Sequence, residues 1–396
     1  MEKRPLRIAI ATDTFYPTIN GVSASTLYYA EELAALGHHV FIFCPRYKGS
    51  VNEVRDFSKP GWSVLRCPAF PVPTNKEHSC SFPRLGFGVD IGKLGIDLVH
   101  IQAPFIMGVW GARLARKLGV PLTQTYHTFW EHYLHYFVLP RFITRPIMVG
   151  QNTSLCNKSA VNFVPSPQMV EGLKNYGVRT KLVVCPTGID VARMKRETNR
   201  AMLEDHIGVP KDRKIILFAS RMCREKSADV ALEAFSLVAK EQGNAVFVMT
   251  GDGPFTKVIR KMVRRLGLEE RVILKGYLPR PDLYAHYAAS DVFLFPSVSE
   301  TQGLVVLEAQ AFGKPVVGVG KMGVKMILKD DVGGLLSEDL DAWKLADLCL
   351  KLLKDPVLYA EKSRQAEANA LEWKTSEYAK LMEREFFEVL ENAKKG

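Results

Sequence analysis

Two segments that lie far apart in this chain begin with the same local pattern. Each has a short apolar run, then a polar loop, and then a stretch with helical periodicity. The first run covers residues 7–12 and leads into Asp13, and the second covers residues 214–219. A strand, a helix and a following strand in this order form a βαβ unit, which requires a parallel sheet with helices on both faces. The pattern therefore predicts an α/β fold.

The first unit illustrates the periodicity. After the loop at residues 14–21, residues of the expected buried face recur at alternating spacings of four and three, as in an amphipathic helix: Val22, Thr26, Tyr29, Leu33 and Leu36. Gly37 ends this helix, and the next strand begins with residues 39–43.

The second half of the chain continues the alternation. We expect helices at 228–241, 255–266, 282–289 and from about Gly303, and strands at 245–250, 272–274, 292–295 and 315–319. Two successive doubly wound domains fit this pattern better than one large sheet. Pro186, Gly188 and Pro210 place the boundary near 186–212. The predicted organisation is an N-terminal domain at 1–190, a C-terminal domain at 191–370 and a closing helix at 371–396.

Composition supports two packed domains. The 396 residues are 47% hydrophobic and 24% charged, a balance that excludes intrinsic disorder. No apolar run reaches the length of a membrane-spanning helix, and the N-terminus lacks a signal-peptide pattern. The seven cysteines show neither a C-x-x-C pair nor metal-ligand spacing, so we expect reduced thiols, a cytoplasmic location and no metal site.

The net charge of +11 is unevenly distributed. Residues 1–190 contain 20 Lys and Arg against 12 Asp and Glu, whereas the remainder contains 33 against 30. A basic half suggests an anionic partner, either nucleic acid or an anionic membrane surface. Ordinary solubility charge explains the same total equally well.

A candidate ligand site follows the expected strand at 292–295. Glu300 and Gly303 lie at the expected start of a helix. Leu304 is among its first residues, and Glu308 lies further along it. Backbone N–H groups at such a helix start favour an anion or a hydroxyl. Glu300 and Glu308 are roughly 8–10 Å apart along a helix axis, a separation that suits two contacts on one extended ligand. A surface charge at the helix start is the alternative for Glu300, whereas Glu308 has apolar neighbours and needs a partner.

Two further loops end strands of the same expected sheet. Arg221 and Lys226 are five residues apart, and together they could neutralise a diphosphate. A solvated charged loop is the alternative. Gly251 begins a Gly-Asp-Gly-Pro turn that allows backbone to approach a ligand closely.

In the first half, Gly21 lies in a loop at a helix start, a second site of the same kind. The absence of a G-x-G-x-x-G fingerprint there argues against a nicotinamide dehydrogenase. The segment around His127, which also contains His132 and His135, combines imidazoles with aromatic residues, as expected for a pocket wall.

Together these segments resemble the family 4 retaining glycosyltransferases, whose GT-B fold has two Rossmann-like doubly wound domains facing a central cleft. The resemblance covers nearly the whole chain and follows the order of the motifs: the Gly21 loop, the His127 segment, residues 186–190, Arg221 with Lys226, residues 251–254, and Glu300 with Glu308. The final helix also resembles the family's last helix, which crosses back to the N-terminal domain.

The resemblance implies roles for the matching residues. Catalytic roles fall on His127, Glu300, Arg221 and Lys226, and donor-binding roles on Gly21, Gly251, Gly303, Leu304 and Glu308. Arg221 and Lys226 would hold the donor diphosphate, Glu300 the donor sugar and Glu308 the ribose. The nucleotide-sugar, expected to be a UDP-sugar, is a co-substrate, so no cofactor and no metal are expected.

Within the family, residues 13–22, 126–128 and 299–304 look most like bacterial diacylglycerol glycosyltransferases. This likeness implies a membrane lipid acceptor, an anionic membrane surface as partner and a peripheral position at the inner face of the membrane, with no nucleic acid. The alternatives are another family 4 transferase with a UDP-sugar or GDP-mannose donor and a phospholipid or polysaccharide acceptor, a basic nucleic-acid-binding protein of Rossmann-like domains, and a twin-Rossmann sugar-nucleotide epimerase.

Overall fold

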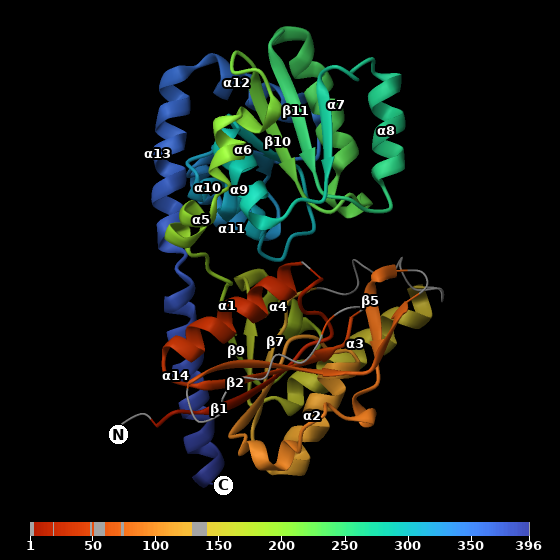
Figure 1. Ribbon diagram of the computed structural model, residues 1–396, viewed down its shortest axis with the longest axis vertical. Helices are drawn as coiled ribbons and strands as arrows, with labels where there is room; N and C mark the ends of the chain where they lie inside the picture. The colour runs from red at the N-terminus through yellow and green to blue at the C-terminus, as the bar shows by residue number, and fades with distance from the viewer. Residues whose placement is uncertain are drawn as a thin grey trace. The chain divides into compact units, whose positions relative to one another are not determined.

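The computed structural model describes residues 4–18, 20–47, 50, 60–72, 75–128 and 141–395, and the chain divides into two compact units (Figure 1). Unit 1 comprises Met1–Gly188 and Thr375–Gly396, and unit 2 comprises Ile189–Lys374. The expected domain limits, residues 190 and 370, lie within a few residues of the two positions where the chain passes from one unit to the other.

The main sheet of unit 1 is parallel, with the strand order β3-β2-β1-β6-β7-β8-β9. Its strands are β1 (Arg7–Ala11), β2 (His39–Pro45), β3 (Gly61–Cys67), β6 (Leu98–Ile101), β7 (Leu122–Thr125), β8 (Val161–Val164) and β9 (Lys181–Val184). Strands β2 and β3 are added in sequence order on one side of β1, and strands β6 to β9 are added in sequence order on the other side. This is the order of a Rossmann fold, and ligands of such sheets bind where the direction changes, here between β1 and β6. A separate antiparallel pair, β4 (Ala69–Val72) and β5 (Asn75–Ser81), follows β3.

Helices cover both faces of this sheet. The helices of unit 1 are α1 (Gly21–Ala35), α2 (Ile106–Leu118), α3 (Arg141–Lys158), α4 (Pro167–Asn175) and α14 (Thr375–Lys395), and the short 3₁₀ turns are η1 (Pro83–Leu85) and η2 (Ile91–Leu94). One apolar core joins α1 and α14 to alternate residues of β1, such as Ile8 and Ile10. The other core joins α2 and α3 to the intervening residues of β1, such as Ala9 and Ala11. The two-residue period of a strand directs these sets to opposite faces.

Unit 2 repeats the architecture with the order β12-β11-β10-β13-β14-β15, again parallel. Its strands are β10 (Lys214–Ala219), β11 (Ala245–Thr250), β12 (Val272–Gly276), β13 (Val292–Phe295), β14 (Val316–Val319) and β15 (Gly334–Ser337). Its helices are α5 (Val191–Glu197), α6 (Arg200–Glu204), α7 (Ala228–Glu241), α8 (Thr256–Arg265), α9 (Arg280–Ala289), α10 (Leu304–Ala311), α11 (Met322–Ile327), α12 (Ala342–Lys354) and α13 (Pro356–Glu372), with 3₁₀ turns η4 (His206–Gly208), η5 (Arg224–Lys226) and η6 (Lys329–Asp331). The switch point lies between β10 and β13.

The closing helix begins at Thr375, a few residues after the expected start at 371. The helical ladder is interrupted because Lys374 forms a parallel bridge with Ile189, and the Trp373 carbonyl accepts a 2.7 Å hydrogen bond from the Ile189 amide. Beyond this break α14 belongs to unit 1, where Met382 and Phe386 enter the core.

Polar contacts fix α14 against the same face of unit 1. Lys181 of β9 forms ion pairs with Glu385 at 2.7 Å and Glu388 at 2.9 Å. The buried His38 accepts a hydrogen bond from the Leu6 amide on Nδ1, which leaves its Nε2–H to donate to Glu383 at 3.2 Å. The last helix therefore belongs to the fold of the first unit.

No helix in the described part of the chain has the length and apolar character needed to cross a membrane.

Candidate active site

In unit 2 the predicted charged residues converge at the switch point. Arg221 and Lys226 follow β10, and Glu300 follows β13, the strand that pairs with β10. The Lys226 ammonium forms an ion pair with Glu300 Oε1, and both side chains are largely buried. Arg221 lies on the same loop, 3.3 Å from Glu225 Oε1, and its side chain is 32% exposed. The structure therefore brings Lys226 into contact with Glu300 and places Arg221 on the loop that carries Lys226.

Two serines join these loops. Ser299 donates to the Glu225 carbonyl at 3.2 Å, and the Ser297 hydroxyl lies 3.3 Å from both that carbonyl and Glu300 Oε1. Ser297 is fully buried. Sequence reasoning did not single out either serine, although both lie in the segment that it identified. They hold the two loops in register and orient the Glu300 carboxylate.

Gly303 occupies the N-cap position of α10 in a left-handed conformation, with φ +92°, and Leu304 is the first residue of the helix. Glycine meets this requirement without strain. The preceding backbone is packed closely by α11, because a Cβ on Gly323 would lie only 2.4 Å from Gln302. Since the first N–H groups of a helix have no carbonyl partner within it, this rigid turn presents backbone donors beside Glu300.

Glu308 lies inside α10 and is buried. Tyr287 of α9, which the sequence analysis did not identify, donates a 3.1 Å hydrogen bond to Glu308 Oε2. Burial raises the pKa of Glu308, while the nearby Arg280 charge and the Tyr287 hydrogen bond oppose that rise. The partner that a carboxylate among apolar neighbours requires is thus a tyrosine on the adjacent helix.

Gly251 has no room for a side chain. With φ +107°, a Cβ there would lie 1.9 Å from the Ser220 carbonyl oxygen. The loop after β11 is further tied to the loop after β10 by the hydrogen bond from the Met222 amide to the Asp252 carbonyl, at 3.0 Å. Tight turn packing therefore accounts for this glycine, in addition to any approach of a ligand.

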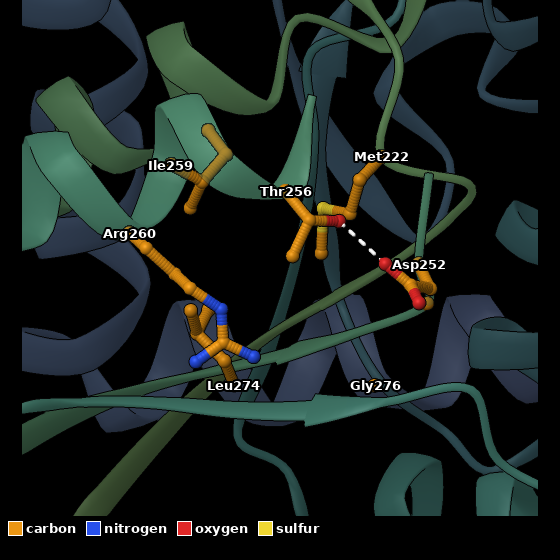
Figure 2. A pocket seen from close by; sticks show the side chains of 8 residues that line it. Met222, Asp252, Thr256, Ile259, Arg260, Leu274 and Gly276 are labelled. Carbon is orange, nitrogen blue, oxygen red and sulfur yellow. Dashed lines mark hydrogen bonds between the residues drawn. The ribbon is translucent and has the colours of Figure 1, made fainter. Parts of the chain in front are cut away.

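A small cavity of about 50 Å³ adjoins this pair of loops (Figure 2). Thr256 donates to Asp252 Oδ1 at 2.7 Å on one side, and the Arg260 side chain extends along another. The remaining wall is mostly apolar, formed by Met222, Ile259 and Leu274 with the backbone of Gly251 and Gly276.

In unit 1, Gly21 is the first residue of α1. Asn20 caps the helix by accepting from the Ser23 amide at 2.9 Å, and it donates to Thr14 Oγ1 at 2.9 Å. No atom of the described chain lies within 4 Å of where a Cβ on Gly21 would be. Packing within the described residues therefore gives no reason for glycine at this position, in contrast to Gly251.

His127 follows β7. Its Nε2 lies in hydrogen-bond contact with Oε1 of the buried Gln102, so Nε2 carries a proton. Burial lowers the pKa of His127 to about 4, and the imidazole is therefore neutral at pH 7. His132 and His135 lie outside the described residues.

Asp13, which the sequence analysis used only to mark the end of a strand, caps α2 of unit 1. Its Oδ1 accepts from the Met107 amide at 2.9 Å, and burial raises its pKa to about 7, opposed by hydrogen bonds from the amides of Met107, Gly108 and Ile106. Its position directly after β1 was the available signal, because residues at the carboxyl ends of strands line the ligand edge of such sheets.

Within the described ranges, no three His, Cys, Asp or Glu side chains gather as ligands for a metal ion. The expectation that no metal is needed stays a prediction.

Comparison with known proteins extends this picture. The family model described as Glycosyltransferase Family 4 matches residues 19–193, and the model described as Glycosyl transferases group 1 matches residues 179–373. The alpha-monoglucosyldiacylglycerol synthase of Streptococcus pneumoniae is 32% identical over 338 residues, which cover 84% of this chain and 75% of that protein.

The chain belongs to glycosyltransferase family 4.

One more sequence relative and one solved structure are similar to this glycosyltransferase. An alpha-monoglucosyldiacylglycerol synthase from Acholeplasma laidlawii is 26% identical over 404 residues, covering 98% of this chain and 99% of that protein. The solved structure of a sucrose-phosphate synthase from Thermosynechococcus elongatus has the same fold, with a TM-score of 0.80 at 20% identity, over 98% of this chain and 100% of that one. The predicted GT-B fold and hexosyltransferase class are confirmed.

Asp13 gives the glycosyltransferase a pH-dependent stability. An aspartate in an unfolded chain has a pKa near 3.9, well below the value of about 7 for folded Asp13. The stability that the folded state gains from this proton is complete below about pH 4 and is lost as the pH rises to about 7. Asp13→Asn removes this titration. The quantity to compare is the fall in the free energy of unfolding in urea between pH 5 and pH 8. We expect this fall to be about 2 kcal/mol smaller in the variant than in the wild type.

The exposed Asp90 of the same unit provides the control, because Asp90→Asn makes the same chemical substitution at the surface. Equal slopes for Asp13→Asn and the wild type would show that folded Asp13 is already ionised at pH 5.

Proposed function

We propose that this glycosyltransferase transfers a hexose from a UDP-sugar to a hydroxyl group of a membrane lipid such as diacylglycerol, with retention of the anomeric configuration. The observation that carries the transfer reaction is the convergence of Arg221, Lys226 and Glu300 where β10 and β13 end. Two relatives that cover most of the chain are named alpha-monoglucosyldiacylglycerol synthases, and these names support the lipid acceptor and the product configuration.

In the proposed mechanism, the donor diphosphate takes the place of Glu300 as the partner of Lys226. Arg221 adds a planar fork of donors, so two cations balance the charge that grows on the leaving diphosphate. Glu300 is then available to accept a hydrogen bond from a sugar hydroxyl, next to the backbone donors at Gly303 and Leu304. Glu308, oriented by Tyr287, binds the ribose hydroxyls.

In unit 1, the proposal assigns the phosphate approach to Gly21 and a contact with the transferred sugar to His127. A neutral imidazole at pH 7 supports this role, because its unprotonated Nδ1 can accept a hydrogen bond from a sugar hydroxyl without adding a competing charge. The acceptor hydroxyl attacks the face from which the diphosphate leaves, so that positioning and charge stabilisation supply most of the catalysis. No metal and no cofactor enter this scheme.

The function is tested by incubating the protein with UDP-glucose, UDP-galactose or GDP-mannose, with and without diacylglycerol, followed by mass analysis of the lipid. We expect a monohexosyl product and release of UDP that requires the acceptor. A hexosylated product formed only with GDP-mannose, or only on a non-lipid acceptor, would contradict the proposal. Interconversion of UDP-sugars without acceptor would instead identify an epimerase.

Arg221→Ala tests the diphosphate contact. Loss of a charge-assisted hydrogen bond should weaken donor binding in calorimetry by about 1.5–3 kcal/mol. Arg224→Ala is the matched control, because Arg224 is an exposed cation of the same loop that has no role in the proposed site. Equal donor affinity in the two folded variants would remove Arg221 from the site.

Glu300→Gln and Glu308→Gln separate the two carboxylates. Glu300→Gln should abolish most turnover at a nearly unchanged melting temperature, because its contact forms with the reacting sugar. Glu308→Gln should mainly raise the KM for the donor, because a ribose contact contributes to ground-state binding. Normal kcat and KM in both variants would refute the assigned roles.

We also propose that the enzyme works at the cytoplasmic leaflet, where α3 of unit 1 contacts the membrane. Phe142 and Ile147, in the first half of α3, are 78% and 59% exposed, and Ile143 is also exposed. Arg145 and Lys158 are exposed cations of the same helix, whereas the side chain of Arg141 lies outside the described residues. Exposed apolar side chains combined with cations are typical of helices that rest in the headgroup region.

The double substitution Phe142→Ala with Ile147→Ala tests this contact. Burying the two side chains in a bilayer is worth about 1.5–3 kcal/mol each, so binding to vesicles of mixed phosphatidylcholine and phosphatidylglycerol should fall at least tenfold in flotation. Trp343→Ala with Val357→Ala is the control, because these side chains of unit 2 are 73% and 77% exposed. An equal loss in both variants, or no loss in either, would remove α3 from the membrane contact.

A further inference from the structure

The outer surface of α8 in unit 2 is strongly cationic, although Val258 is also exposed there. The helix has the sequence TKVIRKMVRR, and its Ile259 and Val263 are buried against the unit. Its five cations are all exposed. Arg260 also borders the cavity beside Gly251, and the other four lie on the side opposite the buried residues: Lys257, Lys261, Arg264 and Arg265. The helix contains no acidic residue, packs against α7 and lies at an edge of unit 2 (Figure 1).

These cations are not neutralised by their neighbours. None of the five forms an ion pair with any residue in the described ranges. The nearest acids in the sequence are Asp252, which precedes the helix and interacts electrostatically with Arg260, and the exposed Glu269 and Glu270, which follow its C-terminal end. Four other exposed lysines of unit 2 differ in this respect, since Lys195, Lys344, Lys351 and Lys354 each pair with a carboxylate at 2.6–2.8 Å.

Stability of the helix does not explain the pattern. Arg264 and Arg265 complement the negative end of the helix dipole, but Lys257 lies at the positive end, where the first turn has no acidic residue. Like charges also recur three and four residues apart, as in Lys257 with Lys261, and such pairs destabilise a helix. A cationic surface that faces solvent and lowers the stability of its own helix indicates a binding partner of opposite charge.

We propose that the outer face of α8 is an electrostatic docking surface for the anionic phospholipid headgroups of a membrane. The choice of a membrane as the partner rests on the lipid acceptor proposed above. A helix of ten residues spans about 15 Å, enough to place its side chains over several headgroups. Because the apolar side of α8 is packed into unit 2, the contact is made by charge alone and weakens with salt, in contrast to the exposed apolar side chains of α3.

Nucleic acid is the competing polyanion, and the surface suits it less well. Proteins that bind single strands without sequence preference combine cations with aromatic side chains on which bases stack. The segment Thr256–Arg265 contains no aromatic residue.

The test uses the full chain with K257Q, K261Q, R264Q and R265Q combined. Glutamine keeps the side chain long and the helix propensity high while removing four charges. Arg260 is retained, because it borders the cavity beside Gly251 and a change there could alter donor binding. The matched control combines K195Q, K344Q, K351Q and K354Q, which removes the same charge from lysines of unit 2 that already have carboxylate partners.

Flotation is measured with vesicles of phosphatidylcholine containing 0, 20 or 40% phosphatidylglycerol, at low and high salt. We expect the α8 variant to bind the anionic vesicles at least tenfold more weakly than the control variant at low salt, and this difference to disappear at high salt. Both variants should bind UDP as the wild type does, which shows that the site is intact.

Equal binding of the two variants to anionic vesicles would overturn the proposal, as would a difference that persists on neutral vesicles or at high salt. A single-stranded RNA that the wild type binds more tightly than anionic vesicles at equal phosphate concentration, and that the α8 variant does not bind, would assign the face to nucleic acid and overturn the proposal as well. These outcomes are separate from those of the lipid-product assay. A chain that glucosylates diacylglycerol while its α8 variant binds like the control keeps the proposed function and loses only this surface.

Discussion

Parallel pairing of β10 with β13 brings two loops together, and the charge arrangement of unit 2 depends on this pairing. The two strands are adjacent in the sheet although 72 residues separate the end of β10 from the start of β13. The chain leaves this pair in opposite directions, so the loops after both strands open at the same edge of the sheet. Arg221, Lys226 and Glu300 meet there, and Ser297 and Ser299 fix the loops by hydrogen bonds to the Glu225 carbonyl. Shifting either loop would separate Lys226 from Glu300, the carboxylate that balances it across the two loops.

Burial sets the charge of the other polar groups near the ligand edges of the two sheets. His127 is neutral because burial lowers its pKa to about 4, and burial raises the pKa values of Asp13, to about 7, and of Glu308. Within unit 2, the positive charges of the site at the end of β10 are those of Arg221 and Lys226. A diphosphate fits this division, since its charge is met by permanent cations while neutral donors remain for sugar hydroxyls.

The distribution of charge differs between the sequence and the folded chain. Counting by halves identifies the N-terminal half as basic and gives the rest a net charge of only +3. In the structure, Glu241, Asp347 and Glu367 of unit 2 each pair with a lysine, whereas α8 carries five cations and no acid. The net charge of a domain does not reveal such a cationic helix face, because it does not record which opposite charges lie close enough to neutralise each other.

The sequence by itself determined the fold class, the two-unit organisation and the loops that carry the charged residues. Apolar periodicity, glycines at helix ends and the order of motifs are local signals, so they survive without knowledge of distant contacts. Tertiary structure alone decided which residues of α14 enter the core of unit 1, that Tyr287 is the partner of Glu308, and that Asp13 caps α2. It also distinguished Gly251, which tight packing requires, from Gly21, whose Cβ position is open. These features depend on which residues of separate elements come within a few ångströms, and that proximity is fixed by the packing of helices on the sheets rather than by any local pattern in the chain.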